Sequence, residues 1–144
     1  MNMFKKTGGF TLVELIVVIA ILAILAGVAI PAYSGYIKSA NDAAVENELT
    51  AISTAAMAAE AVAGELTAIT VNKAGDTVTI TGVDAAKFAE DFKAFSGKTA
   101  TATANAGEFT VTITPSNAWN GSTYAEENGA SWTPAGGWVV EDNP

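Results

Sequence analysis

Residues 5–36 read KKTGGFTLVELIVVIAILAILAGVAIPAYSGY, and this stretch decides how the chain begins. The 23 residues from Leu15 to Ile37 carry no charge. As a helix they would span roughly 34 Å at 1.5 Å per residue, which is enough to cross a hydrocarbon core of about 30 Å. Glu14 stands at the head of this run, inside an apolar stretch that begins at Phe10. That carboxylate needs an explanation, because a charge deep in a bilayer costs about 2.5–3.5 kcal/mol.

Two ordinary segment types share part of this pattern. Lys5 and Lys6 precede the run, and the positive-inside rule then places that end of the chain in the cytoplasm. A secretory signal peptide has the same basic start and small residues near its cut, as at Ala32 and Ser34, but its apolar region is usually about 7–15 residues long. A plain signal anchor fits the length. Neither segment type gives Glu14 a role, although the residue could simply lie at the membrane interface.

A positive charge near Glu14 could come from a new N-terminus. The apolar stretch contains no lysine or arginine, whereas Gly8 and Gly9 directly precede Phe10 and offer a protease an unhindered backbone. Cutting after Gly9 would place an α-amino group on Phe10, four residues before Glu14. One helical turn separates the two groups, so they could pair within one chain or between two chains. Pairing is what makes a buried charge tolerable.

The segment GFTLVELIVVIAILAILAGVAIPAY, within residues 5–49, resembles the prepilin cleavage and methylation motif of type IV pilins and related pseudopilins. The resemblance implies that prepilin peptidase cuts between Gly9 and Phe10 and that Phe10 is then N-methylated. It implies that Glu14 neutralises the N-terminal amine of a neighbouring subunit during assembly. Pro31 falls on the helix-kinking proline of the family, and Gly27, four residues earlier, weakens the same stretch.

By this resemblance the chain is expected to be a type IV pilin precursor. The implied partners are other copies of the chain in a helical homopolymer, prepilin peptidase, the assembly machinery of the cytoplasmic membrane, and membrane lipid before assembly. The precursor would cross that membrane once, with its N-terminus in the cytoplasm, and the mature subunit would lie in a surface pilus used for adhesion or motility. A pseudopilin of a type II secretion system is one alternative. A membrane-anchored sugar-binding module that never polymerises is an alternative of another class.

Composition restricts the chemistry of the chain. Cysteine and histidine are absent, which excludes Cys or His nucleophiles and Cys/His zinc sites. Fifteen acidic residues against seven lysines give a net charge of −8, the wrong sign for replacing the counterions of a nucleic acid. We therefore expect no enzyme activity, no catalytic residue, no metal or cofactor and no direct contact with nucleic acid. Pseudopilins can carry calcium near their C-termini, and this resemblance makes Glu141 and Asp142 a weak candidate site for calcium.

The sequence predicts four segments: a leader at 1–9, the membrane or filament-core half of a long helix at 10–37, its amphipathic half at 38–63, and a globular head at 64–144. Six apolar positions predict one face of the second half, with Asp42, Glu46, Glu48 and Glu60 mostly off that face and Gly64 as its stop. The six positions are Val45, Leu49, Ile52, Ala56, Ala59 and Ala63.

The head has the alternating pattern of an antiparallel sheet. A hairpin is predicted at Thr67–Val71 and Thr77–Thr81, a second strand pair on either side of residues 105–107, and a last strand at Gly137–Val140. Between the hairpins a short helix is predicted after Asp84, with Phe88, Phe92 and Phe95 on one face. The fold class is therefore α+β, with the sheet packed on the second half of the long helix. Three tryptophans in the tail, Trp119, Trp132 and Trp138, are predicted to be core residues, with sugar stacking as the alternative.

Overall fold

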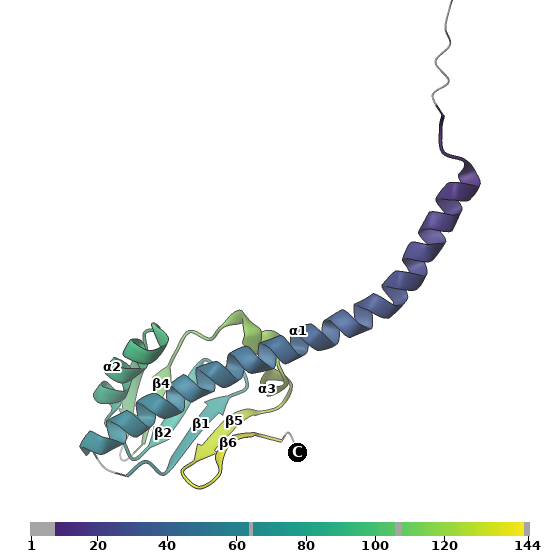
Figure 1. Ribbon diagram of the computed structural model, residues 1–144. Helices are drawn as coiled ribbons and strands as arrows, with labels where there is room; N and C mark the ends of the chain where they lie inside the picture. Colours follow the sequence, from purple (N-terminus) through teal and green to yellow (C-terminus); the bar gives the residue numbers. More distant parts are fainter. Residues whose placement is uncertain (1–7, 64, 106–107, 143–144) are drawn as a thin grey trace, which may run out of the picture. The chain divides into compact units, whose positions relative to one another are not determined.

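The structure is a computed structural model that describes residues 8–63, 65–105 and 108–142 (Figure 1). The chain divides into two compact units, one ending at Tyr36 and the other beginning at Ile37. Helix α1, Leu12–Ala63, contributes to both units, and each unit is described by itself. The α+β fold predicted from the sequence is confirmed.

The first unit consists of the beginning of α1 and the residues before it. The predicted helix start at Phe10 is wrong by two residues, because Thr11 caps the helix and Leu12 is its first residue. The predicted end at Ala63 is confirmed, and the predicted stop at Gly64 lies outside the described residues. Helix α1 continues on both sides of Pro31, which lies inside it.

The second unit contains one six-stranded antiparallel sheet in the order β3-β4-β2-β1-β5-β6. The strands are β1 Ala68–Asn72, β2 Thr77–Thr81, β3 Thr101–Asn105, β4 Glu108–Thr112, β5 Gly129–Thr133 and β6 Gly137–Val140. The first predicted hairpin and the last strand are confirmed to within one residue, and the second predicted strand pair is confirmed as β3 and β4. The predicted turn at 105–107 falls partly outside the described residues, and Asn105 itself ends β3.

Strand β5 is the one that sequence reasoning missed. Its residues GASWT have a glycine, an alanine and a serine where strands usually carry β-branched side chains. Tertiary pairing overrides that weak propensity, because β5 pairs with β1 along Ile69–Asn72 and with β6 on its other side. Gly129 has a φ of 115°, and a Cβ there would lie 2.0 Å from the carbonyl oxygen of Val71. Only glycine fits this start of the strand.

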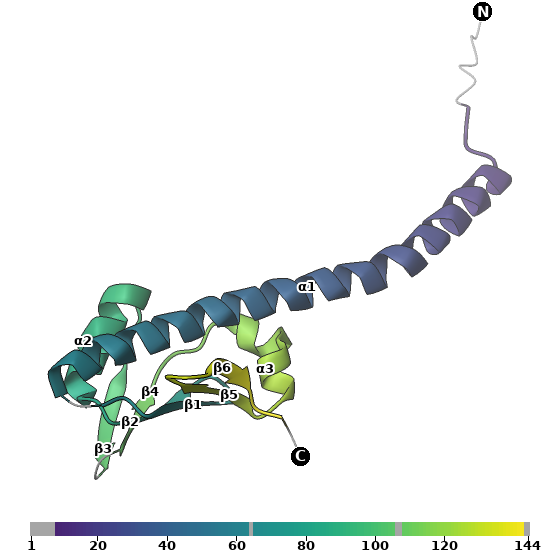
Figure 2. The same cartoon turned by 60° about the horizontal axis from the view of Figure 1, so that its bottom comes forward.

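One face of the sheet is covered by helices and carries the core. Figure 2 shows the second half of α1 and α2, Ala85–Ser96, on the same side of the sheet. The predicted apolar face of α1 is confirmed at its described side chains, since Val45, Leu49, Ile52, Ala56 and Ala59 are all buried. They pack against the inward residues of the strands, which are Ile69, Val71, Val78, Ile80, Val111 and Trp132.

Helix α2 forms as the sequence predicts, with one correction. The Asp84 carboxylate accepts a hydrogen bond from the backbone N–H of Lys87 at 2.8 Å, which is an N-cap. Phe88 and Phe92 are buried and their rings stack at 5.7 Å. Phe95, predicted on the same face, is instead 55% exposed, one residue before the helix ends at Ser96.

A 3-10 turn, η1 Asn117–Gly121, and a short helix, α3 Thr123–Glu126, join the sheet to α1 through polar contacts. The Asp42 carboxylate accepts hydrogen bonds from the backbone N–H and the hydroxyl of Thr123, at 2.7 and 2.9 Å. Glu48 is buried and accepts hydrogen bonds from Ser116 Oγ at 3.0 Å and from Trp119 Nε1 at 2.9 Å. Asp42 and Glu48, predicted only to lie mostly off the apolar face of the helix, thus hold the η1–α3 segment to α1.

Candidate processing and assembly site

The described residues before α1, from Gly8 to Thr11, are exposed and have no regular secondary structure. Gly8 and Gly9 are exposed, and a Cβ added to either would meet no atom within 4 Å. Phe10 follows with 94% of its surface exposed. The structure thus places the predicted scissile pair, Gly9 and Phe10, in non-helical backbone two residues ahead of the helix. Extended, accessible backbone is what a protease requires of its substrate.

Glu14 has a partner within its own chain that sequence reasoning missed. Its Oε2 accepts a hydrogen bond from the backbone N–H of Thr11 at 2.9 Å, and its own N–H donates to Thr11 Oγ1 at 3.2 Å. This reciprocal pair is a capping box, which satisfies two of the N–H groups left free at a helix start. The T-x-x-E spacing of Thr11 and Glu14 was the signal that could have revealed it.

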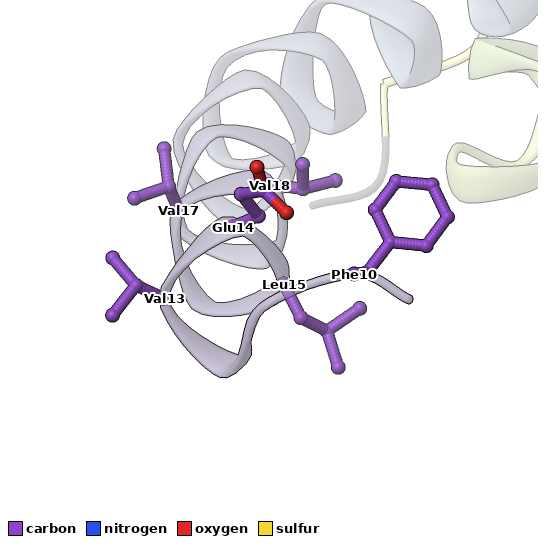
Figure 3. Close-up of a pocket in the computed structure, with 6 residues that line it drawn as sticks. All are labelled: Phe10, Val13, Glu14, Leu15, Val17 and Val18. Atoms are coloured by element: carbon purple, nitrogen blue, oxygen red, sulfur yellow. The ribbon is translucent and has the colours of Figure 1, made fainter. Parts of the chain in front are cut away.

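The capping box still leaves Glu14 available to a cation. Of its two carboxylate oxygens, the structure gives a hydrogen bond only to Oε2 among the described residues. Figure 3 shows the carboxylate at the first turn, where every other labelled side chain around the open hollow is apolar. These side chains belong to Phe10, Val13, Leu15, Val17 and Val18. In apolar surroundings an unneutralised carboxylate is costly, so a nearby ammonium group would be strongly favoured.

The apolar run behind Glu14 is unpartnered within the first unit. Every residue from Gly8 to Tyr36 is exposed, and side chains such as Val28 and Ile24 expose 72% and 70% of their surface. A face of this kind indicates a missing environment, either lipid or other chains. Within the described residues, α1 is long and apolar enough to cross a membrane, as judged by length and composition alone.

Gly27 and Pro31 are the predicted kink residues, and the backbone hydrogen bond that would normally join them cannot form. Pro31 has no N–H, so the carbonyl of Gly27 lacks its usual donor four residues on. Ser34 Oγ donates to the carbonyl of Pro31 at 2.9 Å, a contact of the type that bends helices. The helical assignment continues through this stretch, and the kink stays a prediction.

Two of the three tryptophans are buried, as predicted for core residues. Trp119 and Trp132 are 1% and 8% exposed, so neither offers a free face to a sugar, whereas Trp138 is half-buried. The backbone carbonyls of Glu141 and Asp142 accept hydrogen bonds from Asn128. Within the described ranges, no group of three or more acidic side chains is placed to hold a metal ion.

The structure thus combines an exposed apolar helix, which begins two residues after Phe10, with a small α+β head. In agreement, residues 4–30 match the prokaryotic N-terminal methylation motif. The type IV major alpha-pilin of Moraxella bovis is 53% identical to this chain over 51 residues, which cover 35% of this chain and 32% of that protein. Fimbrial protein Q of Moraxella bovis matches with the same identity and coverage.

The comparisons identify the first third of the chain as that of a type IV pilin-like protein. The chain matches about one third of the length of these curated relatives. No solved structure matches the chain.

Proposed function

We propose that the chain is the precursor of a type IV pilin, a structural subunit that polymerises into a surface fibre after cleavage between Gly9 and Phe10. The observation that carries the proposal is the first unit itself. Its apolar helix is exposed from end to end, and Glu14 is the one charge between Leu12 and Tyr36. A helix of this kind can be buried first in lipid and later against the helices of other subunits.

In the proposed assembly step, Glu14 sets the stagger between neighbouring subunits. Cleavage places an α-amino group on Phe10, and N-methylation leaves that group protonated at neutral pH. In the low-dielectric centre of a helix bundle, an ammonium–carboxylate pair favours the one register in which the two groups meet. The capping box holds Oε2 and leaves Oε1 for the incoming amine.

Cleavage also changes the charge of the subunit. Removal of the leader takes away Lys5 and Lys6, so the side-chain charge falls from −8 to −10. The new amine and Glu14 offset each other inside the fibre. The fibre would therefore present strongly acidic heads to the solvent.

Substitution of Glu14 tests the proposal. We expect Glu14→Ala and Glu14→Gln to be cleaved at Gly9–Phe10 like the native chain, because neither substitution alters the scissile pair. Both should reduce sheared surface fibres to background, because the neighbouring amine loses its counter-charge. Cleavage is read from the mass of the N-terminal peptide, and fibres from immunoblots of the sheared fraction.

Glu90→Ala provides the matched control, since Glu90 is an exposed acid on α2 in the second unit. It should leave both readouts unchanged. Normal fibres from Glu14→Ala would contradict the assembly role of Glu14. Processed subunits that accumulate only in the cell envelope would favour a pseudopilin instead.

A further inference from the structure

A small pocket opens on the head between α1, α3 and β6. It is lined by Glu46, Leu49 and Thr50 of α1, Tyr124 of α3 and Trp138 of β6, with a volume of about 260 Å³. None of these residues belongs to the processing site, and the proposed cleavage and assembly steps do not use them. The pocket is large enough for the end of one long side chain.

The chemistry of the pocket combines aromatic rings with negative charge. Tyr124 is buried, and its ring meets that of Trp119 edge-on at 6.0 Å. Its hydroxyl lies 3.4 Å from Glu46 Oε1, which is a weak contact, and Glu46 itself is exposed. Burial is the main cause that raises the pKa of Tyr124, and the nearby carboxylates of Glu46 and Asp42 add to it. Among the described lysines, none forms an ion pair with Glu46.

Aromatic side chains beside a carboxylate that has no ion-pair partner among the described residues form a site for a compact organic cation. We propose that this pocket binds the side-chain ammonium of a lysine from a second copy of the chain. This inference rests on the proposed function, because the second copy is the neighbouring subunit of the fibre. A neutral sugar would use the rings but not the charge of Glu46.

Lys73 is the lysine that fits this role. Among the described lysines, Lys38, Lys87 and Lys98 pair with carboxylates of their own head, whereas Lys73 and Lys93 do not. Lys93 lies in the last turn of α2, where a cation favourably faces the helix carbonyls. Lys73 lies exposed in the turn between β1 and β2, with no such local role.

Charge balance supports a contact of this kind between heads. Mature heads are strongly acidic, so neighbouring heads repel one another unless their free cations reach carboxylates on the next copy. One weak contact repeated at every subunit of a fibre gains strength through multivalency. Lys73 in the pocket of the next copy would therefore oppose the repulsion at each step.

Zero-length cross-linking of intact native fibres tests the contact directly. A carbodiimide joins an amine to a carboxylate only when the two groups touch, so wild-type fibres should yield a ladder of linked subunits. Mass spectrometry should find an amide between the Lys73 peptide of one copy and the Glu46 peptide of another. Lys73→Arg keeps the charge, so its fibres should form, but that linked peptide should be lost.

Lys93→Arg is the matched control and should leave the Lys73–Glu46 peptide at its wild-type yield. In addition, Lys73→Glu should lower fibre yield several-fold, and combination with Glu46→Lys should restore it. Wild-type fibres without the Lys73–Glu46 peptide would overturn the inference while leaving the proposed function intact. Absence of wild-type fibres altogether would overturn the proposed function, and this contact with it.

Discussion

At the scale of single residues, the hydrogen bonds between Thr11 and Glu14 give both side chains a role at the start of α1. The carboxylate that is out of place in an apolar run closes a capping box with Thr11, and both hydrogen bonds of the box are present. A charge that is costly alone thus has one internal partner before assembly. The free oxygen remains for a second partner after cleavage.

The capping box predicts a local effect of Thr11→Val, which removes the hydroxyl and keeps the shape. The first turn of α1 should lose about 1 kcal/mol of stability, because the Glu14 N–H loses its acceptor. Amide hydrogen exchange of the full chain in micelles should then be about fivefold faster at Glu14 and Leu15, whose N–H groups are hydrogen-bonded to Thr11. Ser34→Ala removes a hydroxyl further along the same helix and should not change this turn. Equal protection in Thr11→Val and in the native chain would contradict the capping role.

Glu48 is the buried charge that holds the tail of the head to α1. It contacts Lys98 Nζ and accepts hydrogen bonds from Ser116 and Trp119. Glu48→Leu should destabilise the head by about 1–3 kcal/mol, because buried donors lose their acceptor, while Lys98 can turn to water. Thermal unfolding followed by near-ultraviolet circular dichroism reports the loss.

Glu90→Leu is the control for this change, since Glu90 is exposed on α2. It should stay within about 0.5 kcal/mol of the native chain. A Glu48→Leu protein as stable as Glu90→Leu would show that the buried network contributes no net stability.

At the scale of elements, the β1–β2 turn is held by a side chain that titrates. The Asp76 carboxylate accepts hydrogen bonds from Asn72 Nδ2 at 2.8 Å and from Thr77 Oγ1 at 3.2 Å. The bond from Asn72 is the main cause that lowers the pKa of Asp76 below its ordinary value. A lowered pKa in the folded state means that the ionised carboxylate stabilises the fold.

This stabilisation has a defined pH dependence. It is fully present above the unfolded pKa of about 3.9 and is lost as the pH falls through the lower, folded pKa. The native chain should therefore melt at a higher temperature than Asp76→Asn at about pH 6, and the difference should shrink below about pH 4. Thermal scans across this range measure the difference. A difference that does not vary with pH would exclude the ionised carboxylate as its source.

The helices and strands also show which parts of the fold can be predicted from the sequence. Regular alternation in β1 and β2 and the Asp84 cap predicted their structures closely, because local chemistry dominates there. Strand β5 was missed because its pairing with β6 and with β1, about 60 residues away in the chain, makes GASWT a strand despite its weak propensity.

The functional and structural side chains also differ in whether the sequence alone predicts their roles. The sequence indicated Gly9, Phe10 and Glu14 through one contiguous motif. The Asp42 and Glu48 contacts to the tail depend on sequence separations of 81 and 71 residues. A pattern within a short stretch of sequence does not predict contacts between residues so far apart in the chain.

At the scale of the whole molecule, we propose that the chain is processed at Gly9–Phe10 and that its apolar helix is then buried in a fibre. The charge arrangement agrees with this claim, since the single carboxylate of the apolar run lies one turn from the new amine. In this proposal the acidic heads remain in solvent, where salt weakens but does not abolish the repulsion between neighbouring heads.

The most direct test is the mass of the N-terminal peptide of the protein sheared from intact expressing cells. The account predicts a peptide that begins at N-methylated Phe10, recovered in the released fraction. A peptide that begins at Met1, or near Gly35, would contradict it, because the first result indicates an uncut anchor and the second a secretory signal peptide.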